Sequence, residues 1–180
     1  MRWILTLLVV LAWHQEIYHT EVERELRALI GDINIQMQAQ AAGPKEETAV
    51  LDEDALRLTS VLKQDNLGKT ERMVALFYRA KARALAVQGQ WRRGETMDTA
   101  MAQLAVEDLD KVIASDVDAP EWGVRTSEAQ YMAGSLSLLP LKAVGRAYSY
   151  WEKCAEHDHA GCLNLMANAR LLGTGGVKVD

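Results

Sequence analysis

The chain has 180 residues, a formal net charge of −5 and only three prolines. This length is enough to bury one core, and the acidic surplus argues against non-specific nucleic-acid binding, which requires a basic surface. Alanine, leucine, glutamate, glutamine and arginine are abundant, and these residue types favour helix over strand.

The first residues have the pattern of an export signal. Arg2 precedes an apolar run from Trp3 to Trp13, which as a helix would be about 16 Å long and therefore too short to cross a hydrocarbon core of about 30 Å. Val10-Leu11-Ala12 offers small residues for cleavage. We expect residues 1–12 to be a signal or a short membrane-associated anchor, and the protein to be periplasmic or envelope-associated. The alternatives are a buried N-terminal helix and a cytoplasmic protein.

Beyond this segment, apolar residues recur at helical spacing. Val22, Leu26, Leu29, Ile33 and Met37 follow one another at steps of four, three, four and four, so they share one helix face. Similar patterns, ended by glycine, proline or capping residues, predict seven helices, at about residues 15–41, 48–64, 70–87, 98–114, 127–139, 141–156 and 160–172. No segment alternates as a strand would, so the predicted fold class is all-α.

Some of these helix boundaries depend on single residues. Gly89 is expected to end the third helix, and Ser127 is expected to cap the fifth at its N-terminus. Pro140 is expected to separate the fifth helix from a sixth that begins at Leu141.

Two segments near the C-terminus resemble each other at a spacing of 33 residues. Small residues fall at matching positions, Ala129 with Cys162 and Gly134 with Ala167, and each segment has a Leu-Leu pair before its break. Small residues at fixed positions let two helices approach closely. A period in the thirties is typical of helical hairpins that bury their apolar faces against neighbouring hairpins.

Residues 127–180 resemble a Sel-one-like repeat, a tetratricopeptide-related helical hairpin of many bacterial proteins. The resemblance is carried by Tyr150-Trp-Glu-Lys-Cys-Ala-Glu-His-Asp-His159 and by Gly173-Thr-Gly-Gly-Val-Lys-Val-Asp180, which has one added residue. Asp158 replaces the family glycine, and Asp tolerates the left-handed conformation better than most residues. Residues 70–122 resemble a looser tetratricopeptide hairpin through Tyr78-Arg-Ala-Lys-Ala and Asp108-Leu-Asp-Lys-Val-Ile113.

The resemblance implies a short solenoid of antiparallel helical hairpins with a long N-terminal helix. It divides the chain into residues 1–12 (signal or anchor), 13–69 (helical region), 70–122 (tetratricopeptide-like hairpin) and 123–180 (Sel-one-like region).

The resemblance also implies a disulfide between Cys154 and Cys162. Both replace small family residues that face each other across the hairpin, and a cysteine-rich secreted branch of the family pairs cysteines at this spacing of eight. Such a bond would stabilise the fold by about 2.5 kcal/mol on the chain-entropy estimate and requires an oxidising compartment. The alternative is a pair of buried free thiols.

A metal site is another interpretation of the same stretch. Cys154, His157, His159 and Cys162 place four ligands within nine residues, a chemically adequate set for zinc or copper. Structural zinc sites use other spacings, and a repeat turn accounts for His159 without a metal. We therefore expect no metal and no cofactor.

The charges are unevenly distributed. Residues 71–93 carry six basic residues and one acid, whereas residues 94–121 carry eight acids and one lysine. Arg72, Arg79 and Arg83 share a helical face, and we consider them a candidate site for an acidic peptide or a C-terminal carboxylate. The alternatives are that this face pairs with acids of the following helix or is merely solvated. In the first case, Arg79→Glu with Arg83→Glu would abolish binding and leave the fold intact.

No nucleophile and base can be paired from the spacing of residues, so we expect no enzyme. The resemblance implies a non-catalytic protein–protein interaction module, an adaptor or scaffold of the bacterial cell envelope, whose partner is a protein or peptide and not a nucleic acid. One alternative is an envelope metal-binding protein or enzyme that uses Cys154, His157, His159 and Cys162. Another is a purely structural subunit that docks through the helix of residues 15–41.

Overall fold

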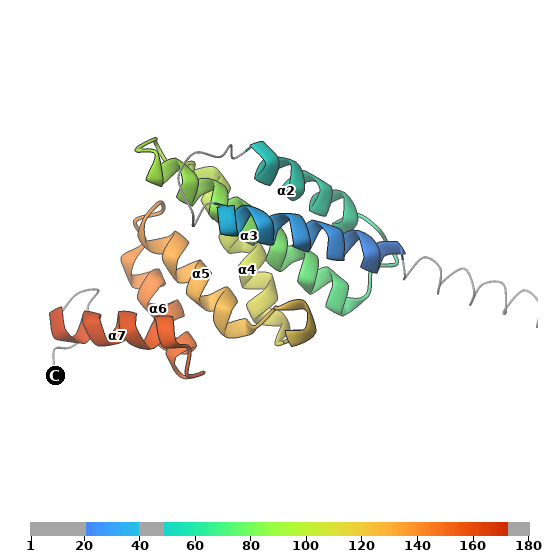
Figure 1. The fold of residues 1–180 in the computed structure, drawn as a ribbon. Coiled ribbons are helices and arrows are strands. Elements are labelled where there is room, and N and C mark those ends of the chain that lie inside the picture. Colours follow the sequence, from blue (N-terminus) through green and yellow to red (C-terminus); the bar gives the residue numbers. More distant parts are fainter. Residues whose placement is uncertain (1–20, 40–48, 173–180) are drawn as a thin grey trace, which may run out of the picture.

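The computed structural model describes residues 21–39 and 49–172 and confirms the all-α fold class. Its elements are a helix over residues 21–39, then α2 (Ala49–Leu62), α3 (Lys69–Arg92), α4 (Thr99–Ser115), the 3-10 helix η1 (Pro120–Trp122), α5 (Thr126–Leu138), α6 (Val144–Ala155) and α7 (Ala160–Leu172) (Figure 1). The predicted signal and the predicted turn at residues 173–180 lie outside the described residues. No helix in the described part of the chain is both long and apolar enough to cross a membrane.

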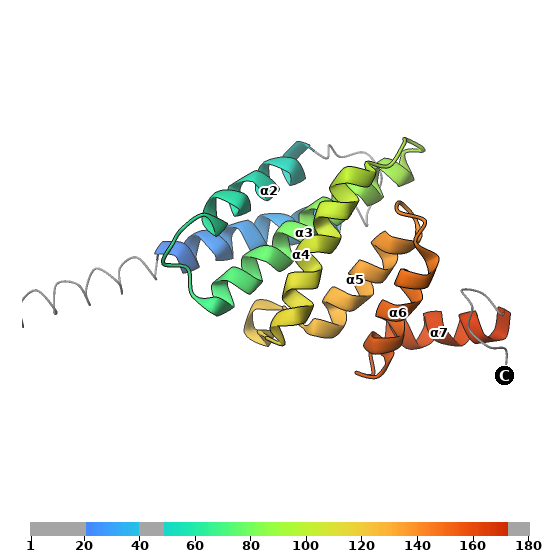
Figure 2. The ribbon, with the colours of Figure 1, turned by 180° about the vertical axis from the view of Figure 1, so that it is seen from behind.

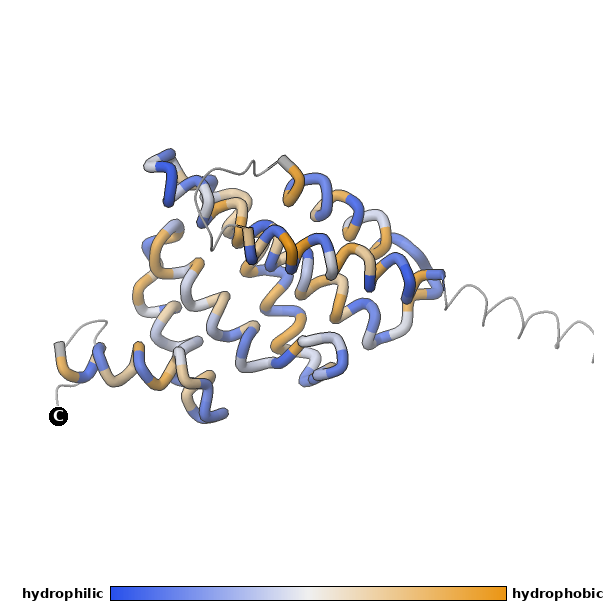
Figure 3. The backbone as a smooth tube through the Cα atoms, viewed as in Figure 1, coloured by the Kyte–Doolittle hydropathy of each residue, from blue (hydrophilic) through white to orange (hydrophobic). Residues whose placement is uncertain are grey.

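From α2 onward, each α-helix packs against the next α-helix along the chain (Figures 1 and 2). Each helix alternates hydrophobic and hydrophilic residues along its length (Figure 3), as amphipathic helices do. The main hydrophobic cluster draws side chains from the helix of residues 21–39 and from α2 to α5. It therefore continues across the predicted region boundaries after residues 69 and 122.

The helix of residues 21–39 buries most of its predicted apolar face. Val22, Leu26, Leu29 and Ile33 are all in the main cluster. Met37, predicted on the same face, is instead exposed and lines a groove, whereas Ile35 on another face is open to solvent.

A second, smaller hydrophobic cluster joins α6 to α7. It consists of Ala147, Trp151, Cys154, Cys162 and Met166. Trp151 packs on Gly134 of α5, where an added Cβ would overlap with the indole ring, and its Nε1 donates a hydrogen bond to the carbonyl of Tyr131 (3.3 Å). The absence of a side chain at Gly134 thus allows α6 to approach α5 closely.

The end predicted for the third helix is wrong. α3 continues through Gly89 to Arg92, and the chain turns at Gly94, which has a φ of 73°. A glycine inside a helix costs about 1 kcal/mol relative to alanine. The buried turn around Val87 and Gly89 keeps the helix intact despite this cost.

The predicted cap of the fifth helix and the predicted start of the sixth are also wrong. Ser127 lies inside α5, and the capping is done by Asp118, whose Oδ1 accepts hydrogen bonds from the Thr126 backbone N (2.7 Å) and Oγ1 (2.9 Å). α6 begins at Val144 rather than Leu141, because Lys142 has a left-handed backbone with φ of 54° that a helix cannot contain.

Candidate functional site

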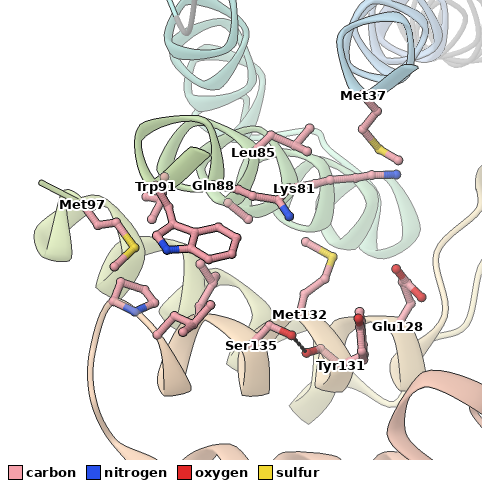
Figure 4. A pocket seen from close by; sticks show the side chains of 15 residues that line it. Met37, Lys81, Leu85, Gln88, Trp91, Met97, Glu128, Tyr131, Met132 and Ser135 are labelled. Atoms are coloured by element: carbon pink, nitrogen blue, oxygen red, sulfur yellow. Dashed lines mark hydrogen bonds between the residues drawn. The ribbon is translucent and has the colours of Figure 1, made fainter. Parts of the chain in front are cut away.

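A groove of about 300 Å³ lies between α3 and α5, beside the end of the helix of residues 21–39 (Figure 4). We call it the α3–α5 groove. Its lining is Met37, Lys81, Ala84, Leu85, Val87, Gln88, Trp91, Met97, Glu128, Tyr131, Met132, Ser135, Leu136, Leu139 and Pro140.

The groove runs along both helices. On α3 its lining follows one helix face from Lys81 to Trp91, a distance of about 15 Å at 1.5 Å per residue. Glu128 of α5 lies at the Lys81 end, and Ser135, farther along α5, lies nearer the Trp91 end (Figure 4). α3 and α5 therefore run in the same direction, as expected when α4 leads back between them.

The end near Trp91 is apolar and open. The Trp91 side chain is 52% exposed and Leu139 is 48% exposed, although both are large hydrophobic residues. Three methionines from separate parts of the chain line the groove: Met97 lies beside Trp91, Met132 comes from α5, and Met37 lies at the Lys81 end (Figure 4). Thioether side chains adapt to irregular apolar surfaces, so the lining of the groove can adjust to an apolar ligand.

The other end of the groove carries opposite charges. Lys81 Nζ donates one long hydrogen bond to Asn34 Oδ1 (3.4 Å) and lies 5.2 Å from the centre of the Tyr78 ring. Burial lowers the pKa of Lys81, and the nearby Glu128 carboxylate partly offsets this by favouring the ammonium form. The carboxylate of Glu128 itself contacts His159 Nε2 at 3.0 Å.

Arg79 and Arg83, two candidates from the sequence, are engaged inside the fold. The Arg79 guanidinium makes two bonds of 2.7 Å to the carboxylate of Asp108, and Arg83 Nη1 lies 2.8 Å from the same carboxylate. Asp108 belongs to α4 and is 2% exposed. Arg79 and Arg83 therefore pair with an acid of the following helix, which is an alternative that the sequence left open.

This arrangement corrects the predicted effect of reversing both charges. Arg79→Glu with Arg83→Glu would place three carboxylates together at the buried contact between α3 and α4, so the fold would not stay intact. Arg72 lies apart from this pair and donates to the backbone carbonyls of Leu62 (3.2 Å) and Gln64 (3.5 Å).

Cys154 and Cys162 form a disulfide between the last turn of α6 and the first turn of α7, with Cα atoms 5.9 Å apart. Both residues are buried, and Cys154 Sγ lies 3.2 Å from the carbonyl oxygen of Ser127. Asp158 in the intervening turn has a φ of 56°, a left-handed conformation that glycine adopts most easily and that Asp tolerates better than most other residues.

His159 is the residue before α7, and its side chain is fixed on three sides. Nδ1 accepts a hydrogen bond from the Cys162 backbone N (3.4 Å), so His159 caps the helix, and Nε2 faces the Glu128 carboxylate. The ring stacks on Tyr131 with centroids 5.1 Å apart. Of the four residues in the alternative metal-site interpretation, Cys154, His159 and Cys162 have their ligand atoms within 4.8 Å of one another. His157 is exposed and is not one of this group.

Sequence reasoning missed the residues that line the groove, above all Lys81, Trp91 and Met132. Helical spacing did contain part of the signal, because Lys81 lies two residues from both Arg79 and Arg83 and must therefore face the other side of α3. Nothing in the spacing indicated that α5 would supply the opposite wall.

No protein-family model matches the chain, and the searches of curated proteins and of solved structures found no match either.

Proposed function

We propose that this protein is a non-catalytic interaction module of the bacterial cell envelope that binds an amphipathic helix of a partner protein in the α3–α5 groove. The observation that carries the proposal is the groove itself, an elongated and mostly apolar surface that is open in the folded chain. Binding of an amphipathic helix by an apolar groove is a recurring mode of peptide recognition.

The walls of the groove favour a helix over an extended segment. An extended peptide gains its affinity by pairing with a free sheet edge, whereas this groove is walled by the side chains of two helices, whose backbone groups are already paired. A length of about 15 Å matches about three turns of a bound helix, with apolar side chains at positions i, i+3 or i+4, and i+7 facing the groove.

The exposed aromatic and methionine side chains supply the expected binding energy. Trp is enriched among the residues that dominate binding interfaces, and Trp91 projects at the apolar end of the groove (Figure 4). The three methionines give the wall the adaptability that helix-binding grooves use.

Lys81 selects the charge of the ligand. Within the described residues, Asn34 is the one hydrogen-bond acceptor that contacts its ammonium group, and at 3.4 Å that bond is weak. A partly desolvated ammonium with free donors favours a carboxylate. The bound helix therefore carries an acidic residue, or its own C-terminal carboxylate, at the end beside Lys81.

Two further features support the wider proposal. The resemblance to Sel-one-like and tetratricopeptide repeats favours a short solenoid that acts as an adaptor, and the succession of packed helices is compatible with that arrangement. The Cys154–Cys162 bond and the apolar segment after Arg2 both favour an exported protein.

The test uses helical peptides selected from a displayed library against the full chain. We expect the selected peptides to carry apolar residues at helical spacing and an acid near one end. Trp91→Ala should weaken the best peptide at least about 10-fold, as loss of an aromatic anchor does, in a fluorescence anisotropy titration. Lys81→Gln should weaken peptides that contain the acid and leave versions with glutamine unchanged.

Leu139→Ala and Leu104→Ala form a matched pair for the same titration. Both leucines are 48% exposed, but Leu139 lines the groove and Leu104 lies on α4 away from it. Leu139→Ala should weaken the peptide and Leu104→Ala should not. Equal effects of the two substitutions, or binding that is unchanged by Trp91→Ala, would show that the groove is not the binding site.

A further inference from the structure

The turn between α6 and α7 gathers two sulfur atoms and an imidazole in one place. Cys154 comes from α6, Cys162 from the first turn of α7, and His159 from the residue that caps α7. We propose that reduction of the Cys154–Cys162 disulfide converts this turn into a zinc site with these three side chains as ligands and Glu128 as the residue that orients His159. The proposal does not depend on the function of the groove.

The distances suit zinc. Tetrahedral zinc with Zn–S of about 2.3 Å and Zn–N of about 2.0–2.1 Å places its ligand atoms about 3.5–3.8 Å apart. In the oxidised chain the three ligand atoms already lie within 4.8 Å of one another, and the two Cα atoms are 5.9 Å apart. Small side-chain rotations after reduction are therefore enough to close the site. Water takes the fourth position, as in other sites with three protein ligands.

His159 is held in the orientation that a metal ligand needs. Its Nε2 contacts Glu128 Oε2 at 3.0 Å, and stacking on Tyr131 fixes the plane of the ring. Nδ1 accepts a hydrogen bond from the Cys162 backbone N, so its lone pair points at the first turn of α7, and zinc binding at Nδ1 replaces this weak hydrogen bond of 3.4 Å. A carboxylate that holds the second nitrogen of a ligating histidine is a common feature of zinc sites, because it fixes the tautomer and increases the basicity of the ligand.

The chemistry has two steps. A dithiol reductant transfers two electrons and two protons to the disulfide: the Cys154–Cys162 bond breaks, two thiols form, and the dithiol becomes a disulfide. Zn²⁺ then binds both sulfur atoms and His159 Nδ1, and the two thiol protons pass to solvent. Because two thiol protons leave, the affinity for zinc should increase as the pH rises.

The experiment is a zinc titration of the full chain in competition with a chromophoric chelator. The chain is reduced with a phosphine, and cobalt(II) substitution reports thiolate ligation through its charge-transfer absorption. We expect the reduced chain to bind one zinc ion and the oxidised chain to show only background binding. Glu128→Gln should weaken the reduced site about 10- to 100-fold, the usual effect of losing such an orienting partner.

His159→Asn and His157→Asn are the decisive pair. Asn retains the capping of α7, so His159→Asn removes the ligand without removing the cap, and it should abolish tight binding. His157→Asn should bind zinc as the unsubstituted chain does, because His157 is exposed and outside the cluster. Equal affinities in the oxidised and reduced chains would overturn the proposal, as would equal effects of the two histidine substitutions.

If reduction loosens α7, hydrogen exchange of its backbone amides provides a second measurement of the site. Zinc should then restore the protection of the α7 amides in the reduced chain. Zinc binding without restored protection would mean that the ion is held by a disordered dithiol, and would overturn the site proposed here.

Discussion

At the residue scale, Asp108 is a buried acid that has three basic partners among the described residues. It pairs with Arg79 through two bonds and with Arg83 through a third, and Lys111 Nζ lies 3.8 Å from it. Removing one partner of a buried ion pair is costly, because the remaining charge stays desolvated and uncompensated. Here the loss of one carboxylate would leave two guanidiniums close to each other.

We therefore expect Asp108→Asn to lower the free energy of unfolding by about 3–5 kcal/mol, measured by urea denaturation. Glu107→Gln removes the neighbouring charge on the exposed side of α4 and serves as the control, with an expected change within about 0.5 kcal/mol. A similar small change in both variants would contradict a stabilising role for the Asp108 pairing.

Asp54 gives the opposite case, a buried acid that is poorly compensated. Asp54 is 2% exposed, and its Oδ2 has no hydrogen-bond partner within the described residues. Burial raises the pKa of Asp54, the negative charge of Asp32 adds to this, and Arg57 at 3.7 Å only partly opposes it. The folded chain therefore holds this proton more tightly than the unfolded chain does.

The sign of the pH dependence follows. The contribution of Asp54 to the free energy of unfolding falls as the pH rises from the pKa of 3.8 in the unfolded chain through the raised pKa in the folded chain. Above the raised pKa, the full destabilisation by the buried charge is present. We expect Asp54→Asn to have a higher thermal midpoint than the unsubstituted chain at pH 7, and the difference to shrink towards pH 4. A difference of the same size at both pH values would refute this account.

At the element scale, the approach of α6 to α5 depends on one missing side chain. Gly134 faces the Trp151 ring, and an added methyl group would force that buried ring to move. Gly145, within α6, has no atom within 4 Å of an added Cβ. Both glycines thus lie within helices, but an added methyl group would be crowded at Gly134 and would meet no neighbour at Gly145.

We expect Gly134→Ala to destabilise the protein by about 1–3 kcal/mol, the usual cost of overpacking a core. Gly145→Ala should stabilise it by up to about 1 kcal/mol, because alanine is the better helix former and meets no neighbour. Thermal unfolding of the two variants measures both, and the same sign for both would rule out the packing argument.

The helices themselves were largely predictable, because they depend on local patterns. The spacing of Val22, Leu26, Leu29 and Ile33 predicted the buried face of the first described helix, and the bounds of α7 agree with the prediction. The error at the start of α5 arose because a contact with a distant residue replaced the local signal. Asp118 caps α5 from a preceding loop, which no inspection of the sequence around Ser127 could reveal.

At the scale of the whole molecule, the groove could not be predicted, because it exists only where α3 and α5 run side by side. Lys81 and Glu128 are 47 positions apart in the sequence, and neither carries an unusual pattern around it. The arginines were the more conspicuous feature of α3, but their charge is used to join α3 to α4. The most noticeable charges in the sequence of α3 thus form a structural contact with α4. The open groove is formed instead mainly by apolar residues of the kind that also fill the core.

The disulfide also determines how the molecule would transmit a mechanical load. Eight residues of extended chain could lengthen to about 27 Å, but the bond holds the Cα atoms of Cys154 and Cys162 at 5.9 Å. A pull on α7 therefore cannot be absorbed by the intervening turn. It passes directly to α6, and through the Trp151 side chain to α5, so that tension applied to α7 would be felt at the wall of the groove.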